Sequence, residues 1–181
     1  MVSDFRKKKY LDIFAHFDTD SNGKIEKKDF ETMAETIAKS PDGTINEVKH
    51  KEYLNALLAI WSGLQQADAN KDGHVSADEW VAQWDAYAKN PAAPQEWQKV
   101  YCKFIFQLLD TGNDGSIDIE EFVKAYESWG FKKDDAVKTF GKLSQGKSTL
   151  SWAEFQKLWQ EYFTSEDANA LGNLLFSSPS P

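Results

Sequence analysis

The sequence predicts an all-α protein made of two pairs of helix–loop–helix units packed into one compact molecule. Three observations predict this fold class: a twelve-residue loop pattern occurs three times, apolar residues flank each copy at helical spacing, and a fourth, degenerate copy completes the second pair. The chain has 181 residues, 41% hydrophobic and 28% charged, which is enough to bury a core and excludes rods and disordered tails.

The three loop segments share their residue types place by place. Each begins with Asp, has Gly at the sixth place and an aliphatic residue at the eighth, and ends in an acid followed by an aromatic ring. They are residues 18–29 (DTDSNGKIEKKD), 68–79 (DANKDGHVSADE) and 110–121 (DTGNDGSIDIEE). This is the calcium-binding loop of the EF-hand.

The spacing follows from calcium chemistry. Calcium takes about 6–8 oxygen ligands at about 2.3–2.6 Å, so a short loop surrounds it only if alternate residues point inward around a sharp turn. Glycine at the sixth place allows that turn, the seventh place gives a backbone carbonyl, and the twelfth closes the cage. The candidate ligands are Asp18, Asp20, Asn22, Lys24 and Asp29 in the first loop, Asp68, Asn70, Asp72, His74 and Glu79 in the second, and Asp110, Asp114, Ser116, Asp118 and Glu121 in the third.

Helices are expected before and after each loop, because apolar residues recur there three or four places apart. They are Tyr10, Phe14, Phe17 and then Phe30, Met33, Ile37 around the first loop, Leu57, Trp61, Leu64 and then Trp80, Trp84, Tyr87 around the second, and Tyr101, Phe104, Leu108 and then Phe122, Tyr126, Trp129 around the third. A turn at residues 40–43 divides the long first interval, and a helix over about residues 47–66 enters the second loop.

A fourth unit is expected because EF-hands pair to bury their apolar faces. Counting back from Glu154 gives a loop over residues 143–154, with Leu150 placed to pair with Ile117. Leu143 replaces the first ligand and Lys147 puts a positive charge at the fifth place, so we expect this loop to bind no metal.

Charge and composition limit the other functions. The net charge of −8 disfavours a nucleic-acid partner. Cys102 is the single cysteine, residues 1–17 lack the uncharged run of a signal peptide, and Val2 stands where N-myristoylation needs glycine. No stretch reaches the about 20 apolar residues of a membrane span. We therefore expect a cytoplasmic protein that is not inserted in a membrane. We also expect a monomer.

Over essentially its whole length, the chain resembles the invertebrate sarcoplasmic calcium-binding proteins and calexcitin, and especially the insect juvenile hormone diol kinase branch. The resemblance rests on the opening SDFRKKK, the long first interval, WDAYAKNP, the degenerate fourth loop, and LWQEYF followed by ALGNLLF. It implies three calcium-binding loops and a C-terminal tail, residues 170–176, that folds back on the core. The expected division is residues 1–90 for the first pair, 91–163 for the second, with a hinge at 90–94, and 164–181 for the tail.

Two loops depart from the usual ligands. Asp29 closes the first loop in place of Glu, and its shorter side chain favours one contact and therefore acceptance of Mg²⁺. Gly112 stands at the third place of the third loop, where a water or Asn113 would have to substitute.

Seven tryptophans and a single internal methionine favour a rigid interior over the methionine-rich groove of a calcium sensor that opens to bind helices. Two interpretations of the rings remain open. They fill the core, or they line a cavity for an apolar ligand such as juvenile hormone diol, with Trp61, Trp84, Tyr101, Phe104, Trp129 and Trp159 as the candidate lining.

The function we expect is that of a cytosolic EF-hand calcium-binding protein, a calcium buffer or sensor. The alternative function is a juvenile hormone diol kinase that uses Mg²⁺ and GTP or ATP. Residues 141–148 (GKLSQGKS) match the phosphate-binding loop pattern, with Gly141, Gly146, Lys147 and Ser148 as the candidate nucleotide-binding residues. The expected context argues against it, because that motif follows a strand and opens a helix, whereas these residues follow a predicted helix over 134–140 and coincide with the fourth loop.

Overall fold

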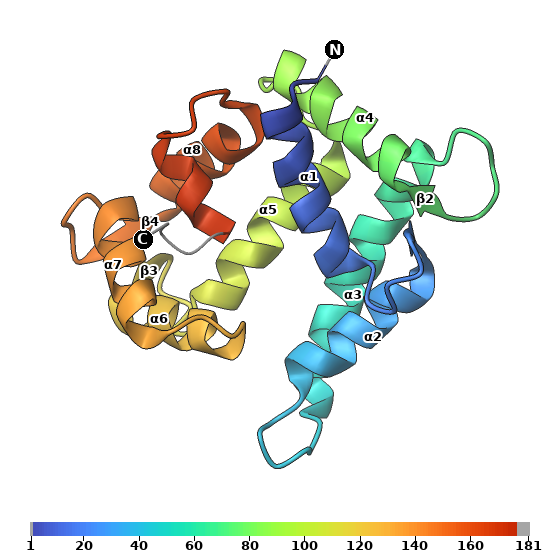
Figure 1. Ribbon diagram of the computed structural model, residues 1–181. Coiled ribbons are helices and arrows are strands. Elements are labelled where there is room, and N and C mark those ends of the chain that lie inside the picture. The colour runs from blue at the N-terminus through green and yellow to red at the C-terminus, as the bar shows by residue number, and fades with distance from the viewer. Residues whose placement is uncertain (1, 177–181) are drawn as a thin grey trace. The chain divides into compact units, whose positions relative to one another are not determined.

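The computed structural model describes residues 2–176, and it is helical with short strands, as the sequence predicts (Figure 1). The elements are α1 (Asp4–Phe17), β1 (Lys24–Ile25), α2 (Lys27–Ala38), α3 (Glu47–Leu64), the 3₁₀ turn η1 (Gln65–Ala67), β2 (Val75–Ser76), α4 (Ala77–Lys89), α5 (Glu96–Leu109), β3 (Ser116–Asp118), α6 (Ile119–Ser128), α7 (Lys133–Leu143), β4 (Thr149–Ser151), α8 (Trp152–Thr164) and the 3₁₀ helix η2 (Leu171–Phe176).

The chain divides into two compact units, the first ending at Tyr101 and the second beginning at Cys102, so the division falls inside α5. Asn90 is the C-cap of α4, and the Ala93 N–H donates to the Asn90 carbonyl at 3.1 Å, which makes a turn where the hinge is expected. The hinge itself, and the boundary near residue 90, stay predictions.

In the first unit, β1 and β2 join the first two loops. They pair antiparallel, with Ile25 opposite Val75, so the eighth places of the two loops meet. Helices α2 and α3 lie side by side, joined by the turn at residues 40–43, in which the Gly43 N–H donates to the Ser40 carbonyl at 2.9 Å (Figure 1).

The core of the first unit is made mainly of aromatic rings. Trp80 and Trp84 are fully buried, and their centroids lie 5.9 and 5.3 Å from that of Trp97. The Trp80 indole N–H also donates to the Tyr10 carbonyl at 2.8 Å, which holds α4 against α1. Rings at these separations pack against one another directly.

In the second unit, β3 and β4 pair antiparallel with Ile117 opposite Leu150, as predicted. Helix α6 packs on α7, and η2 packs on α8 and α7, which places residues 171–176 on the core of this unit. The predicted tail runs to residue 181, and its last five residues lie outside the described part of the chain. Trp129 is 42% exposed at the end of α6, so its placement in the lining of an interior cavity was wrong.

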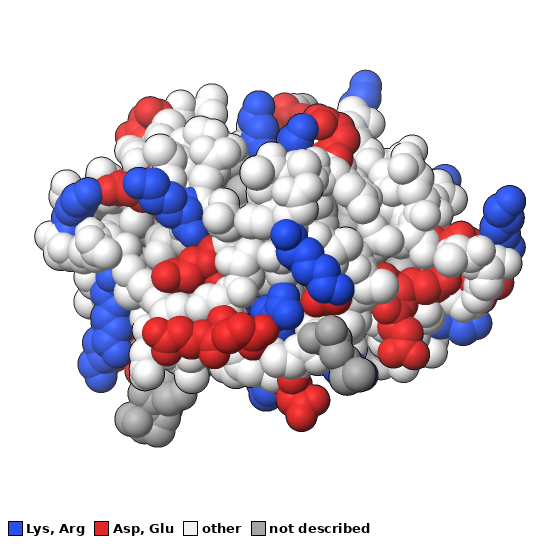
Figure 2. All heavy atoms as spheres, turned by 90° about the horizontal axis from the view of Figure 1, so that it is seen from above, with Lys and Arg blue, Asp and Glu red and all other residues white. Residues whose placement is uncertain are grey.

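The basic residues near the start of α1 have acidic neighbours. The Arg6 guanidinium lies 3.4 Å from the Asp85 carboxylate, and the Lys8 ammonium lies 2.9 Å from that of Asp12. Figure 2 shows basic and acidic side chains interspersed across the visible face.

Candidate metal centres

The first-place aspartates organise the first three loops in the same way. In the first loop, one Asp18 oxygen accepts from the Asn22 N–H at 2.9 Å and the other from the Gly23 N–H at 2.8 Å. Asp68 makes the equivalent bonds at 3.1 and 2.9 Å, and Asp110 at 3.1 and 2.9 Å. Each loop is therefore folded around its first carboxylate.

The sixth-place glycines make this fold possible. Gly23, Gly73 and Gly115 have φ of +82°, +86° and +87°, in the left-handed region that glycine adopts without steric cost. Positive φ values also occur at the fourth places of these loops, Ser21, Lys71 and Asn113. In the fourth loop the positive φ values fall on the third and fourth places, Gln145 and Gly146, at +53° and +79°, and not on the sixth.

The twelfth-place acids close the loops from the next helix. In the second loop, one Glu79 oxygen accepts from the Ser76 N–H at 2.9 Å and the other from the Ala69 N–H at 3.1 Å. Glu121 closes the third loop in the same way, with the Asp118 N–H at 3.0 Å and the Gly112 N–H at 2.7 Å. These acids therefore cap the following helix and reach back to the start of the loop.

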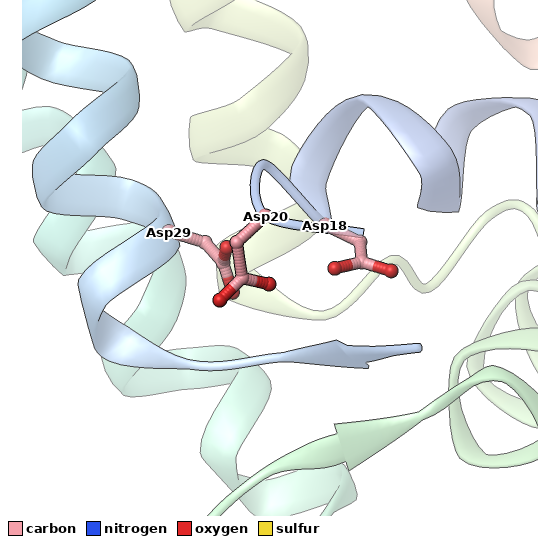
Figure 3. A group of neighbouring side chains, drawn as sticks. All are labelled: Asp18, Asp20 and Asp29. Atoms are coloured by element: carbon pink, nitrogen blue, oxygen red, sulfur yellow. The ribbon is translucent and has the colours of Figure 1, made fainter. Parts of the chain in front are cut away.

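Asp29 spans the first loop although its side chain is shorter. Its Oδ1 accepts from the Thr19 N–H at 3.0 Å and from the Thr19 hydroxyl at 2.7 Å, and its Oδ2 from the Glu26 N–H at 2.8 Å. Asp18, Asp20 and Asp29 each bring one carboxylate oxygen within 4.8 Å of the others. They come from the end of α1, the loop and the first turn of α2, and point toward one space (Figure 3).

The third loop accommodates its missing third-place ligand through the closing acid. A Cβ added to Gly112 would lie 3.1 Å from Glu121 Oε1, so the closing carboxylate lies directly beside the third place. The Thr111 hydroxyl approaches the same oxygen at 3.3 Å. The sequence alone indicated only the missing oxygen, and not that Glu121 would lie against this backbone.

The other candidate ligands lie where the loop pattern puts them. Asp20, Asn70, Asn22, Asp72 and Asp114 accept backbone N–H bonds inside their loops, at 2.9 to 3.2 Å. His74 Nδ1 lies 3.0 Å from Asp72 Oδ1. Asp118 accepts from the Glu121 N–H at 2.9 Å and so serves as the N-cap of α6. Lys24, His74 and Ser116 lie at the seventh place, whose backbone carbonyl is the expected ligand.

The fourth loop keeps the closing acid but has no carboxylate at its first and fifth places. Glu154 accepts from the Ser151 N–H at 2.9 Å, as in the other loops, but its second oxygen receives the Lys147 ammonium. This contact lowers the pKa of Glu154 from its ordinary 4.5 to about 2, with further help from the Ser151 N–H and hydroxyl. Leu143 at the first place is buried. The sequence indicates the positive charge at the fifth place but not its pairing with the closing acid.

Around residues 141–148 the order of elements differs from that of a phosphate-binding loop. Gly141 lies inside α7, and β4 follows the segment, whereas the phosphate motif follows a strand and opens a helix. The N–H groups of Gly146 and Lys147 donate to the carbonyls of Gly141 and Ser144, at 3.0 and 3.1 Å. The local structure therefore gives no support to nucleotide binding by Gly141, Gly146, Lys147 and Ser148.

Comparisons with known proteins agree with the loop geometry. Models of the EF-hand domain pair match residues 1–36 and 99–160, and a model of the single EF hand matches residues 63–82. The chain belongs to the EF-hand family. As an EF-hand protein it is 28% identical to the sarcoplasmic calcium-binding proteins I, III and IV of Branchiostoma lanceolatum, over 98% of this chain and 100% of that protein.

Two further relatives support the placement. Calexcitin-1 of Caenorhabditis elegans is 28% identical over 97% of this chain and 87% of that protein. The solved structure of an amphioxus sarcoplasmic calcium-binding protein has a TM-score of 0.81 at 27% identity, covering 99% of this chain and 100% of that one. This EF-hand protein is thus a homologue of the sarcoplasmic calcium-binding proteins and calexcitin. The narrower placement in the diol kinase branch is not supported.

Proposed function

We propose that this protein binds three Ca²⁺ ions, in the loops over residues 18–29, 68–79 and 110–121, and acts as a cytoplasmic, monomeric calcium buffer. The observation that carries the proposal is the shared fold of these loops around a first-place carboxylate, with an acid from the next helix closing each one. Such a set of carboxylate, amide and carbonyl oxygens suits a hard divalent cation.

The residues present fit the ion in all three loops. A bound calcium would supply positive charge between carboxylates that otherwise repel one another, and Asp18, Asp68 and Asp110 would hold it at the base of the loop. The closing acids would exchange their contacts at the loop start for the ion. Because their other oxygens cap the next helix, the acids are already oriented toward the loop.

A buffer is favoured over a partner-binding sensor by the interior. Sensors expose flexible methionine-rich surfaces when calcium binds, whereas this chain buries rigid rings in direct contact. In the first unit, the ring centroids of Trp80 and Trp84 lie 5.7 Å apart, and those of Phe17 and Tyr101 lie 5.1 Å apart. The contact of ring with ring favours core filling over a cavity, and an apolar ligand such as juvenile hormone diol stays a prediction.

The first loop is the one we expect to accept Mg²⁺. Magnesium requires six ligands at about 2.0–2.1 Å, and a compact set of carboxylates closed by the shorter Asp29 suits it better than calcium's larger shell. The convergence of Asp18, Asp20 and Asp29 within 4.8 Å supports a divalent cation in this loop, and the preference for Mg²⁺ rests on the shorter side chain of Asp29.

Isothermal titration of the calcium-stripped protein tests the number of sites. The expected stoichiometry is three, falling to two in the double variant Asp68→Ala, Glu79→Gln. Asp78→Asn is the matched control, because it removes one negative charge from the same loop at a place that is not a ligand. A stoichiometry of four in the unaltered chain, or no loss in the double variant, would contradict the proposal.

A reciprocal exchange of closing acids tests the magnesium assignment. Asp29→Glu should raise the calcium-to-magnesium affinity ratio of the first loop, and Glu79→Asp should lower that of the second. Competition titrations measure both ratios. If neither ratio moves, side-chain length at the twelfth place does not set selectivity in this protein.

A further inference from the structure

The C-terminal segment of the second unit, η2 (Leu171–Phe176), packs closely against α8. Gly172 lies so close to this helix that an added Cβ would be 2.5 Å from the Leu158 carbonyl oxygen and 2.8 Å from the Tyr162 nitrogen. The Gly172 N–H donates to Glu161 Oε2 at 2.5 Å. Contacts with backbone atoms cannot be relieved by a side-chain rotation, so only glycine fits at position 172 in this packing.

Apolar contacts also hold the end of the segment, residues 175 and 176, against α8. The Phe176 ring lies edge-on to Trp159 and Tyr162, with centroid distances of 5.8 and 5.0 Å. Leu175 is 2% exposed. The segment is therefore packed as part of the core of this unit.

A second anchor comes from a different helix. The hydroxyl of Tyr126, on α6, donates to the Leu175 carbonyl oxygen in a short hydrogen bond. Tyr126 is 1% exposed, and burial raises the pKa of its hydroxyl, so it remains a donor at neutral pH. The Phe122 ring stacks on Tyr126 at 4.0 Å, which fixes the direction of the hydroxyl.

The two helices joined in this way follow different loops. Helix α6 carries Glu121 in its first turn, so its start belongs to the third loop. Helix α8 carries Glu154 in its first turn, which is already held by the Lys147 ammonium of its own loop. The segment thus contacts both α6, which begins at the proposed metal site of the third loop, and α8, whose first turn is held by the Lys147 ammonium.

We propose that docking of residues 171–176 and calcium binding in the third loop stabilise each other. With the segment docked, Glu121 is already turned into the loop, with Oε1 2.7 Å from the Gly112 nitrogen. The same position of α6 places Tyr126 beside Leu175 and Glu121 at the start of the loop. Coupling of this kind is reciprocal, so calcium fixes the segment and the segment raises the calcium affinity of the third loop.

Limited proteolysis of the full chain tests one direction. Residues 166–169, which precede the segment, are exposed, and mass spectrometry can follow cleavage after Glu166 by a glutamate-specific protease. Calcium should slow this cleavage in the unaltered chain and in Glu79→Gln, but not in Glu121→Gln. Equal protection in the two variants, or none in the unaltered chain although three ions bind, would overturn the proposal.

Calcium titration tests the other direction. Tyr126→Phe removes only the hydroxyl, and the loss of one neutral hydrogen bond should weaken calcium binding in the third loop by about two- to tenfold. Gly172→Ala should weaken it further. Gly141→Ala is the matched control, since an added Cβ there meets no atom within 4 Å. Unchanged third-loop affinity in Tyr126→Phe, with faster cleavage after Glu166, would show a segment that is docked but not coupled.

This inference rests on the proposed function, and the two can fail separately. If the titration of the unaltered chain shows no ion in the third loop, the proposed stoichiometry fails and the coupling fails with it. If three ions bind and cleavage after Glu166 is unaffected by calcium, only the coupling fails.

Discussion

The third and fourth loops have the same backbone framework, a paired strand followed by a capped helix, but they differ in the side chains at the ligand places. Their strands pair with each other, and each is followed by a helix with a capping box, Asp118 with Glu121 in one and Ser151 with Glu154 in the other. The third loop surrounds its space with oxygens, whereas the fourth has a buried leucine at its first place and a lysine paired to its closing acid. The paired strands and the capped helix therefore form whether or not the first and fifth places carry carboxylates.

The comparison shows how an EF-hand pair keeps its shape when one loop lacks the carboxylates of the first and fifth places. A closing acid needs a positive partner or hydrogen-bond donors, because a carboxylate without them pays a desolvation cost. In the third loop the Gly112 N–H meets Glu121, and in the fourth the Lys147 ammonium meets Glu154. The lysine supplies within the chain a charge that the other loops are proposed to take from solution.

The largest expected effect is on calcium stoichiometry, when the third loop is given the first-place and fifth-place residues of the fourth. Asp110→Leu with Asp114→Lys removes the first carboxylate and adds a positive charge, so calcium stoichiometry should fall from three to two. The far-ultraviolet circular dichroism should stay that of a folded helical protein, because the fourth loop folds with these residues. Three bound ions in this variant would mean that the first and fifth places do not decide metal binding.

Removing the shared cap should have an intermediate effect. Ser151→Ala deletes the N-cap of α8 and should lower the free energy of unfolding by about 0.5–2 kcal/mol, equally with calcium and with chelator. Asp118→Ala in the third loop should cost a similar amount in chelator and more in calcium. Urea unfolding under both conditions measures the difference. A calcium-dependent loss in Ser151→Ala would contradict the independence of the fourth loop.

The contribution of the Lys147–Glu154 pair to the free energy of unfolding should depend on pH, and we expect this effect to be smaller than that of removing the cap. The folded-state pKa of Glu154 is lowered from 4.5 to about 2, so its stabilisation is present above about pH 4.5 and is lost as the pH falls through about 2. Glu154→Gln should therefore be less stable than the unaltered chain at neutral pH. In chelator, the difference should shrink as the pH falls through this window, and a difference constant from pH 6 to pH 2 would count against the pair.

Restoring acids alone should have no effect on calcium stoichiometry. In Leu143→Asp with Lys147→Asp the fourth loop regains two carboxylates, but its positive φ values stay at Gln145 and Gly146, and not at the sixth place. We therefore expect three ions by titration and not four. A fourth ion would show that the side chains, and not the backbone path, keep this loop free of metal.

Much of the frame could be predicted from the sequence, because the signals are local. Loop ligands and turn glycines lie within twelve residues of one another, and the eighth-place residues fix the register of the paired strands. The loss of the first carboxylate at Leu143 could be recognised for the same reason. Trp129 was misplaced because helical spacing indicates a face and not whether that face is covered.

The sequence by itself determined the EF-hand repeats, the candidate ligands and the degenerate fourth loop, because each depends on short spacing along the chain. Only the tertiary structure decided which groups meet across longer separations. The approach of Glu121 to the Gly112 backbone, the pairing of Lys147 with Glu154, and the bond from Tyr126 to Leu175 are contacts of this kind. They depend on how loops close and helices pack, because spacing along the chain does not fix the distance between side chains that neighbouring elements bring together.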